Sequence, residues 1–232
     1  MSFDIAPGVA GNGAAALPMG VQDEFETHFP VLFMQRRHTG VAALNRELAS
    51  LVRELERTRK SWAPNTKKQY RAGYSSALDF FDLPHPAVPV ARQLTVDAVG
   101  AYMKHLQGVG LLEMGESTLA DYRMELFGWC VLLRQGDWVC PHIHKGGAFS
   151  GVYYVEVPPL EYPEGCIEFV NPQGFYGSVP GRALAETTRL MPEEGTMLLF
   201  PASYMHLVYP FHGTGDRICF SFTVQFELGD EA

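Results

Sequence analysis

Three histidines and one arginine in the C-terminal half of the chain have the residue types and spacing of a metal site. His142 and His144 stand two residues apart, shortly before the apolar run that starts at Ser150. His206 follows a second apolar run, and Arg217 opens a third one eleven residues later. Side chains at i and i+2 of an extended strand point to the same side, so His142 and His144 can converge on one ion.

The chemistry of imidazole indicates a catalytic rather than a structural metal site. Neutral imidazole nitrogens bind Fe, Zn, Cu or Ni at about 2.0–2.2 Å. Three ligands on one side of an ion leave its opposite side open to a substrate or to O2. A histidine pair of this spacing also occurs at ordinary strand ends, so the pair alone is a weak signal. The third histidine, His206, and Arg217 strengthen it.

Residues 217–226, RICFSFTVQF, alternate between two kinds of side chain. In a strand, Ile218 and Phe220 would face one side with the other apolar residues, while Arg217 and Cys219 would face the opposite side with the small polar ones. If that second side were solvent, Arg217 would be a surface charge. If it were the interior of a barrel, the small side chains would leave room for a ligand, and the arginine would bind a carboxylate through two hydrogen bonds. The alternation does not choose between these structures.

The elements that must position these side chains change type along the chain. Residues 1–27 are rich in glycine and alanine and predict a loose arm, and residues 28–232 predict a single domain. A helical period of apolar residues predicts helices at residues 41–60 and 95–108. Both helices lie in a helical region that extends over about residues 41–110 and supports the part of the domain that follows.

From about residue 118 to residue 228 the period changes to two, and short strand-like runs alternate with turns rich in glycine and proline. Another short strand is expected at residues 29–34. Because the helices precede the strands instead of alternating with them, the fold class is α+β and mainly β. A β-barrel of jelly-roll type with flanking N-terminal helices fits this order best.

Composition and charge limit the classes of partner. The formal net charge of −8 argues against nucleic acid, because phosphate binding needs a basic surface. No apolar run reaches the roughly 18 residues of a membrane span, and the N-terminus lacks the pattern of a secretory signal. The four cysteines have no zinc-finger spacing and are too few for a disulfide framework. We therefore expect a cytoplasmic protein with neither a nucleic-acid nor a membrane partner.

The chain also carries a series of motifs: the histidine pair HIH followed by SGVYY, then EGTMLLFP, a distal histidine and RICFSF. This series resembles the bacterial type of 2-oxoglutarate- and Fe(II)-dependent oxygenases. The resemblance extends, through less specific motifs, over about residues 28–226. It implies a double-stranded β-helix, a jelly roll of cupin-like form, and an enzyme that uses Fe(II), 2-oxoglutarate and O2 to hydroxylate a substrate while 2-oxoglutarate is converted to succinate.

The resemblance assigns the metal ligands, with one departure from the usual pattern. His142 and His206 match the two histidines of the family, whereas His144 falls where the wider superfamily has an aspartate or a glutamate. Three neutral imidazoles leave a charge of +2 at Fe(II), and the dianionic 2-oxoglutarate would offset it. Sites of three histidines also occur in cupins. A cupin-type dioxygenase or isomerase that does not use 2-oxoglutarate is therefore one alternative, and a non-catalytic jelly-roll binding protein is another.

The resemblance also assigns residues to the cosubstrate. Arg217 matches the residue that pairs with the distal carboxylate of 2-oxoglutarate. The resemblance further implies that a tyrosine on the strand after the histidine pair assists Arg217 in binding the cosubstrate. Tyr154 is the first choice and Tyr153 the second. Ser150, at the start of that run, is a further candidate for cosubstrate binding. Cys219 stands where a serine is usual, and its thiol forms weaker hydrogen bonds than the serine hydroxyl would.

The substrate is not readable from the sequence. The substrate can be a small molecule or a peptide side chain. A homodimer is an open alternative for the oligomeric state. The loop at residues 172–189 is a candidate lid, although a long surface loop without such a role is an equal alternative.

Overall fold

The computed structural model describes residues 31–59, 73–112, 121–171 and 187–228, which all belong to one compact unit, Val31–Ala232. The described helices are α1 (Ala42–Thr58), α2 (Ala87–Gly108) and the short 3-10 helix η2 (Phe80–Asp82). The described strands are β1 (Met34–Arg37), β2 (Tyr74–Ser75), β3 (Tyr122–Leu133), β4 (Val139–His142), β5 (Phe149–Glu156), β6 (Ile167–Val170), β7 (Thr187–Leu190), β8 (Thr196–Pro201), β9 (His206–Val208) and β10 (Arg217–Leu228). The loose arm expected at residues 1–27 and most of the candidate lid lie outside the described residues.

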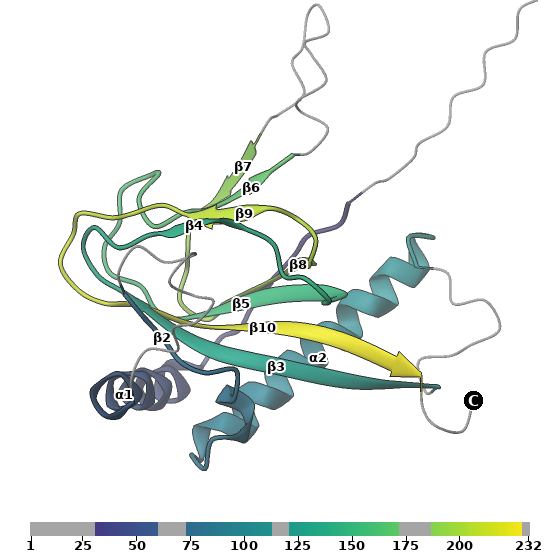
Figure 1. The fold of residues 1–232 in the computed structure, drawn as a ribbon, viewed down its shortest axis with the longest axis horizontal. Helices are drawn as coiled ribbons and strands as arrows, with labels where there is room; N and C mark the ends of the chain where they lie inside the picture. Colours follow the sequence, from purple (N-terminus) through teal and green to yellow (C-terminus); the bar gives the residue numbers. More distant parts are fainter. Residues whose placement is uncertain (1–30, 60–72, 113–120, 172–186, 229–232) are drawn as a thin grey trace, which may run out of the picture. The chain divides into compact units, whose positions relative to one another are not determined.

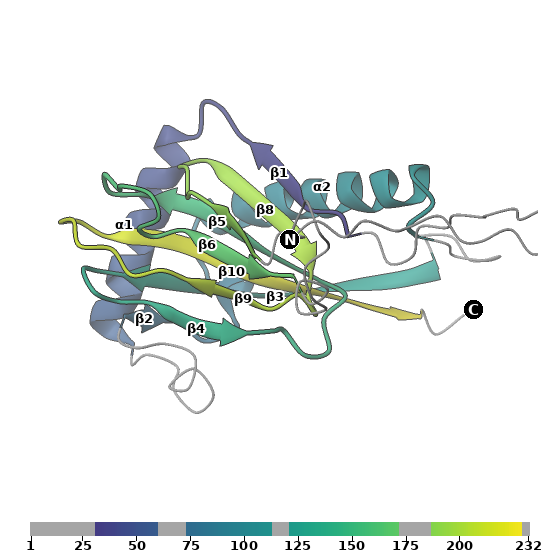
Figure 2. The same cartoon turned by 90° about the horizontal axis from the view of Figure 1, so that it is seen from above.

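The strands form two antiparallel sheets that face each other, as Figure 1 shows. The larger sheet has the order β1-β8-β5-β10-β3-β2, and the smaller sheet has the order β4-β9-β6-β7. Strand β10 lies inside the larger sheet, where it pairs with β3 on one side and with β5 on the other. Viewed from above in Figure 2, the smaller sheet lies over β3, β5 and β10. This is the mainly β architecture expected from the sequence.

Strand β10 separates two hydrophobic cores because its side chains alternate between its two faces. Ile218, Phe220 and Phe222 are fully buried under α1 and α2, which cover the outer face of the larger sheet in Figure 1. Cys219 belongs to the second core, which fills the space between the two sheets. The alternation left open whether Arg217 faces solvent or the interior of a barrel. Arg217 is only 2% exposed, so it faces the interior.

Helix α2 begins at Ala87, eight residues earlier than expected from the sequence. Prolines usually indicate turns, but Pro86 precedes the helix as its N-cap and Pro89 lies in its first turn. Proline is tolerated at these positions because the N–H groups of the first turn have no partner within the helix. None of the described helices has the length and the apolar character needed to cross a membrane.

The first strand was also expected in the wrong place. The apolar run at residues 29–34 predicted it, whereas β1 is Met34–Arg37 and pairs with β8 at the edge of the larger sheet. The strand alternates half-buried and exposed residues, and Arg37 is bonded to Glu193 at 3.0 Å. Strand formation at an edge depends on the partner strand more than on apolar content, and charged residues are common there.

Candidate metal centre

The three histidines converge at one end of the space between the sheets. His142 ends β4 and His206 starts β9, and the two are direct partners in the smaller sheet. His144 follows β4, and its backbone N–H donates to Ala202 O at 2.9 Å. The ring centroids lie 4.3 Å apart for His142 and His206, and 5.1 Å apart for each of the other two pairs. One potential ligand atom from each residue lies within 4.8 Å of the others.

Hydrogen bonds to the backbone fix the tautomers of two of these rings. His142 Nδ1 lies 2.8 Å from Cys140 O, and His206 Nδ1 lies 2.9 Å from Tyr204 O. A carbonyl oxygen can only accept, so each Nδ1 must carry the proton. Each Nε2 is then left with a free lone pair, which is the form that binds a metal ion.

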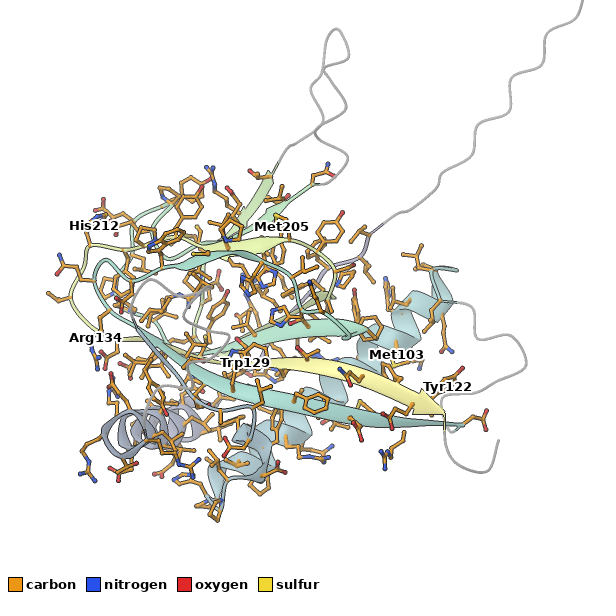
Figure 3. The ribbon with its side chains drawn as sticks, viewed as in Figure 1. Met103, Tyr122, Trp129, Arg134, Met205 and His212 are labelled. Carbon is orange, nitrogen blue, oxygen red and sulfur yellow. The ribbon has the colours of Figure 1, made fainter. Side chains whose placement is uncertain are left out.

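His144 is held by side chains from the larger sheet. Its Nδ1 lies 3.2 Å from the hydroxyl of Thr223 on β10. Its ring stacks on the indole of Trp129, with the centroids 5.3 Å apart and the planes at 26°. Trp129, labelled in Figure 3, comes from β3, the neighbour of β10. The Nε2 atom of His144 lies 3.3 Å from His206 Nε2.

Burial keeps the three imidazoles neutral. Desolvation lowers the pKa of His142 below its ordinary value and, with the nearby His142 ring as a second cause, lowers the pKa of His144 to about 3. Desolvation also lowers the pKa of His206 well below its ordinary value, and the other two histidines add to this effect. Rings with such pKa values carry no charge near pH 7, so no proton has to leave before a metal ion binds.

The residues present fit a divalent transition metal. Two nitrogens that each lie about 2.1 Å from one ion are roughly 3.0–3.5 Å apart at the angles of octahedral or tetrahedral coordination. The 3.3 Å between His144 Nε2 and His206 Nε2 falls in this range. Neutral imidazole suits Fe, Zn, Cu and Ni, and the donor set alone does not select among these metals.

The same cavity extends from the histidines to a buried arginine. Trp129, Ser150, Tyr154, Arg217 and Cys219 are among its lining residues. No Asp or Glu is among the described residues that line it. The cavity therefore offers three neutral ligands at one end and a fixed positive charge, which suits an anion.

Arg217 is held in this cavity without a carboxylate partner among the described residues. Its Nε has no hydrogen-bond partner, and its Nη1 makes only a long contact of 3.9 Å to Cys219 Sγ. The guanidinium carbon lies 5.2 Å from the centroid of the Tyr154 ring, within the range of a cation–π contact. The Tyr154 hydroxyl is buried and lies within hydrogen-bonding geometry of no partner in the described part of the chain. Desolvation raises its pKa and outweighs the opposite effect of the nearby Arg217, so it stays a hydrogen-bond donor.

The two tyrosines proposed from the sequence lie on opposite faces of β5. Tyr154 lines the cavity, whereas Tyr153 points into the core under the helices and donates to Asn45 Oδ1 at 2.8 Å. The second choice, Tyr153, therefore does not face the cavity, because neighbouring residues of a strand face opposite sides. Ser150 lines the cavity, and its hydroxyl donates to Phe222 O at 2.9 Å, which leaves its oxygen lone pairs to accept.

The sequence reasoning missed the two side chains that hold His144. The signal for Thr223 was present, because Thr223 follows Arg217 by six residues in one strand and so lies on the same face. Trp129 had no such signal, since its contact with His144 depends on how β3 and the loop after β4 meet in space. Of the predicted lid at residues 172–189, the described part forms strand β7.

The comparisons with known proteins agree with this geometry. Residues 128–223 match the family described as "Putative 2OG-Fe(II) oxygenase". The predicted resemblance and enzyme class are thereby confirmed. This family uses Fe(II) as its metal cofactor, with 2-oxoglutarate and O2 as cosubstrates, as predicted. A comparison with curated proteins gives no match.

Solved structures confirm the double-stranded β-helix fold. A prolyl-4-hydroxylase from Pseudomonas putida is 16% identical with a TM-score of 0.56, over 83% of this chain and 91% of that one. A prolyl hydroxylase from Trichoplax adhaerens, solved with a peptide fragment of hypoxia inducible factor, is 13% identical with a TM-score of 0.55, over 83% of each chain. HygX from Streptomyces hygroscopicus, solved with nickel and 2-oxoglutarate, is 14% identical with a TM-score of 0.51, over 83% of this chain and 82% of that one.

Proposed function

We propose that this protein is an Fe(II)- and 2-oxoglutarate-dependent oxygenase that hydroxylates a substrate not yet identified. In the balanced reaction, one oxygen atom of O2 enters a C–H bond of the substrate to give an alcohol. The other oxygen atom enters the succinate that forms as 2-oxoglutarate loses CO2. Bound Fe(II) would supply the activation of O2, and the protein would supply the ligands of the ion and a cavity that orients the cosubstrate.

The metal would be held by His142, His144 and His206. Nε2 is the atom that each ring would offer to the ion, because each Nδ1 is engaged by Cys140 O, by Thr223 or by Tyr204 O. Three neutral rings would leave the charge of the ion at +2. The dianionic cosubstrate would bring compensating charge to the open side of the ion.

The far end of the cosubstrate would be bound by Arg217 and Tyr154. A guanidinium pairs with a carboxylate through two parallel hydrogen bonds, and a phenol adds a third donor. The Nε of Arg217 and the hydroxyl of Tyr154 are both buried without a partner among the residues that the structure describes. Ser150, the second residue of the same strand, would present its hydroxyl oxygen to the cavity as an acceptor.

The observation that carries this proposal is the buried arginine in the same cavity as the three histidines. A buried charge without a partner is costly, and a ligand carboxylate would remove that cost. A cupin-type enzyme that does not use 2-oxoglutarate would have no need for this charge. The lining residues do not choose between a small-molecule and a peptide substrate.

The decisive measurement is 2-oxoglutarate binding and conversion by the purified full chain. With Fe(II) and ascorbate in air, we expect slow succinate formation even without the substrate, and in the absence of O2 we expect binding of 2-oxoglutarate that depends on the metal. Metal binding with neither 2-oxoglutarate binding nor succinate formation would refute the proposal and favour a cupin-type enzyme. A protein that binds no transition metal would favour the non-catalytic alternative.

A further inference from the structure

His144 differs from the other two histidines in what holds its Nδ1. His142 and His206 use the carbonyl oxygen of the residue two positions earlier in their own segment, so the backbone provides the contact. The contact of His144 comes from the hydroxyl of Thr223, which is 79 residues away in the chain and belongs to the other sheet. The Nδ1 contact of His144 therefore depends on one side chain, and that side chain can be changed without altering the backbone.

Thr223 contacts the segment of His144 with both branches of its side chain. It is only 8% exposed. A Cβ atom placed on Gly147 would lie 2.3 Å from the Thr223 methyl carbon, which means that the backbone of the loop after His144 lies directly against that methyl group. The methyl group thus packs on the loop, while the hydroxyl reaches the ring.

Stacking on Trp129 does not by itself orient the ring of His144. The indole fixes the plane of the imidazole, with the two planes at 26°. A 180° rotation about the Cβ–Cγ bond would keep this plane but exchange Nδ1 with Cδ2 and Nε2 with Cε1. Only one of the two orientations places a nitrogen beside the Thr223 hydroxyl, and that orientation also turns Nε2 toward His206.

A hydroxyl suits this position because it can both accept and donate. Metal binding needs the lone pair of His144 Nε2, so Nδ1 must then carry the proton and donate to the Thr223 oxygen. Without a metal, His144 Nε2 lies 3.3 Å from His206 Nε2, which has no proton because His206 Nδ1 donates to Tyr204 O. His144 then donates from Nε2 and accepts from Thr223 at Nδ1. A carbonyl oxygen would serve only the first of these states.

We infer that Thr223 is a positioning residue, which turns Nε2 of His144 toward the metal and keeps its Nδ1 paired in both states. The inference rests on the proposed metal site and adds the group on which its third ligand depends. Two substitutions separate the contributions of the two branches. Thr223→Val keeps the methyl contact with Gly147 and removes the hydroxyl, whereas Thr223→Ser keeps the hydroxyl and removes the methyl group.

The test is the affinity of the metal-free full chain for Co(II), measured by calorimetry, with the visible absorption of bound Co(II) as a second readout. Loss of a contact behind a metal ligand typically costs 10–100-fold in affinity, so we expect Thr223→Val to weaken Co(II) binding by about that factor. Its Co(II) spectrum should also change, as expected for one ligand fewer. Thr223→Ser should stay within about threefold of the wild type and keep its spectrum.

The matched control is Thr95→Val, which also removes a buried threonine hydroxyl. Thr95 is fully buried in α2, where its hydroxyl donates to Ala91 O at 2.9 Å. We expect unchanged Co(II) affinity in this variant. An unchanged affinity and spectrum in Thr223→Val would overturn the inference, and so would an equal loss in Thr223→Ser, which would assign the effect to packing.

The outcome for the wild type separates this inference from the proposed function. A wild-type chain that binds no Co(II) contradicts the metal site itself and, with it, the inference. A wild-type chain that binds Co(II) with the same affinity as Thr223→Val contradicts only the role of Thr223. Because the readouts are metal affinity and a ligand spectrum, neither outcome depends on finding the substrate.

Discussion

Replacing Arg217 by methionine should have opposite effects on stability and on cosubstrate binding. Arg217 is 2% exposed, and no carboxylate among the described residues pairs with its guanidinium. In the protein without ligands it is therefore a buried charge whose Nε has no partner. Methionine has a similar length and no charge, so it fills the same space without this cost.

The sizes of the two effects follow from that burial. An unsatisfied buried polar group costs about 1–3 kcal/mol. We therefore expect the ligand-free Arg217→Met protein to be more stable than the wild type by about 1 kcal/mol or more, which is roughly 2–4 °C in Tm for a domain of this size. Loss of one partner of a buried ion pair costs about 2–5 kcal/mol, so 2-oxoglutarate should bind at least roughly 30-fold more weakly.

Thermal unfolding with and without ligand measures both effects in one assay. When 2-oxoglutarate is added to the metal-loaded protein, it should raise the Tm of the wild type and leave that of Arg217→Met almost unchanged, while calorimetry gives the change in Kd. Arg134→Met is the matched control, because Arg134 is half-exposed and paired with Glu56 and Asp216. This control should lose some stability and keep its affinity for 2-oxoglutarate. An affinity of Arg217→Met within threefold of the wild type would refute the reasoning.

Three further results are expected. Tyr153→Phe should lower the free energy of unfolding by about 1 kcal/mol through loss of the bond to Asn45 and leave 2-oxoglutarate affinity unchanged, as measured by urea unfolding and calorimetry. Asp216→Asn should lower Tm by only a few degrees, since its ion pairs with Arg53 and Arg134 are partly exposed; a loss of folding would contradict this. The metal-free protein should lose stability as pH falls from about 6.5 toward 3, because desolvation lowers the pKa of the three ligand histidines in the folded state, so the unfolded state binds more protons over this range. Urea unfolding at pH 7.5 and 5.5 tests this, and equal stability at both values would contradict it.

The sequence predicted those parts of the site that follow from periodicity within one strand. The alternation in residues 217–226 defined two faces, and the structure assigns one to the helices and the other to the cavity. The spacing of His142 and His144 also predicted that the two rings converge, and they do, although His144 lies beyond the end of β4 and is placed by its own contacts. Local geometry decides such features, so a single sequence contains them.

Features that depend on contacts between distant segments could not be predicted in this way. Tyr153 and Tyr154 are identical in type, and only the pairing of β5 with β10 decides which one faces the cavity. The start of α2 was missed because prolines indicate turns in general but are tolerated in the first turn of a helix. The partners of His144 come from β3 and β10, and the histidine pair itself gives no sign of them.

The charges in the cavity indicate why the metal and the cosubstrate should bind together. The cavity contains three neutral imidazoles and one guanidinium, with no carboxylate among the described lining residues. A divalent ion alone would add two positive charges to a poorly solvated space that already holds one, and the dianion alone would overcompensate that single charge. The two together add no net charge, so each should strengthen the binding of the other, by the same factor in both directions. A carboxylate at position 144 would neutralise part of the charge of the ion without the cosubstrate. The neutral His144 leaves this charge to be compensated by 2-oxoglutarate. The neutral triad and Arg217, which has no carboxylate partner among the described residues, are therefore consistent with one site for both ligands.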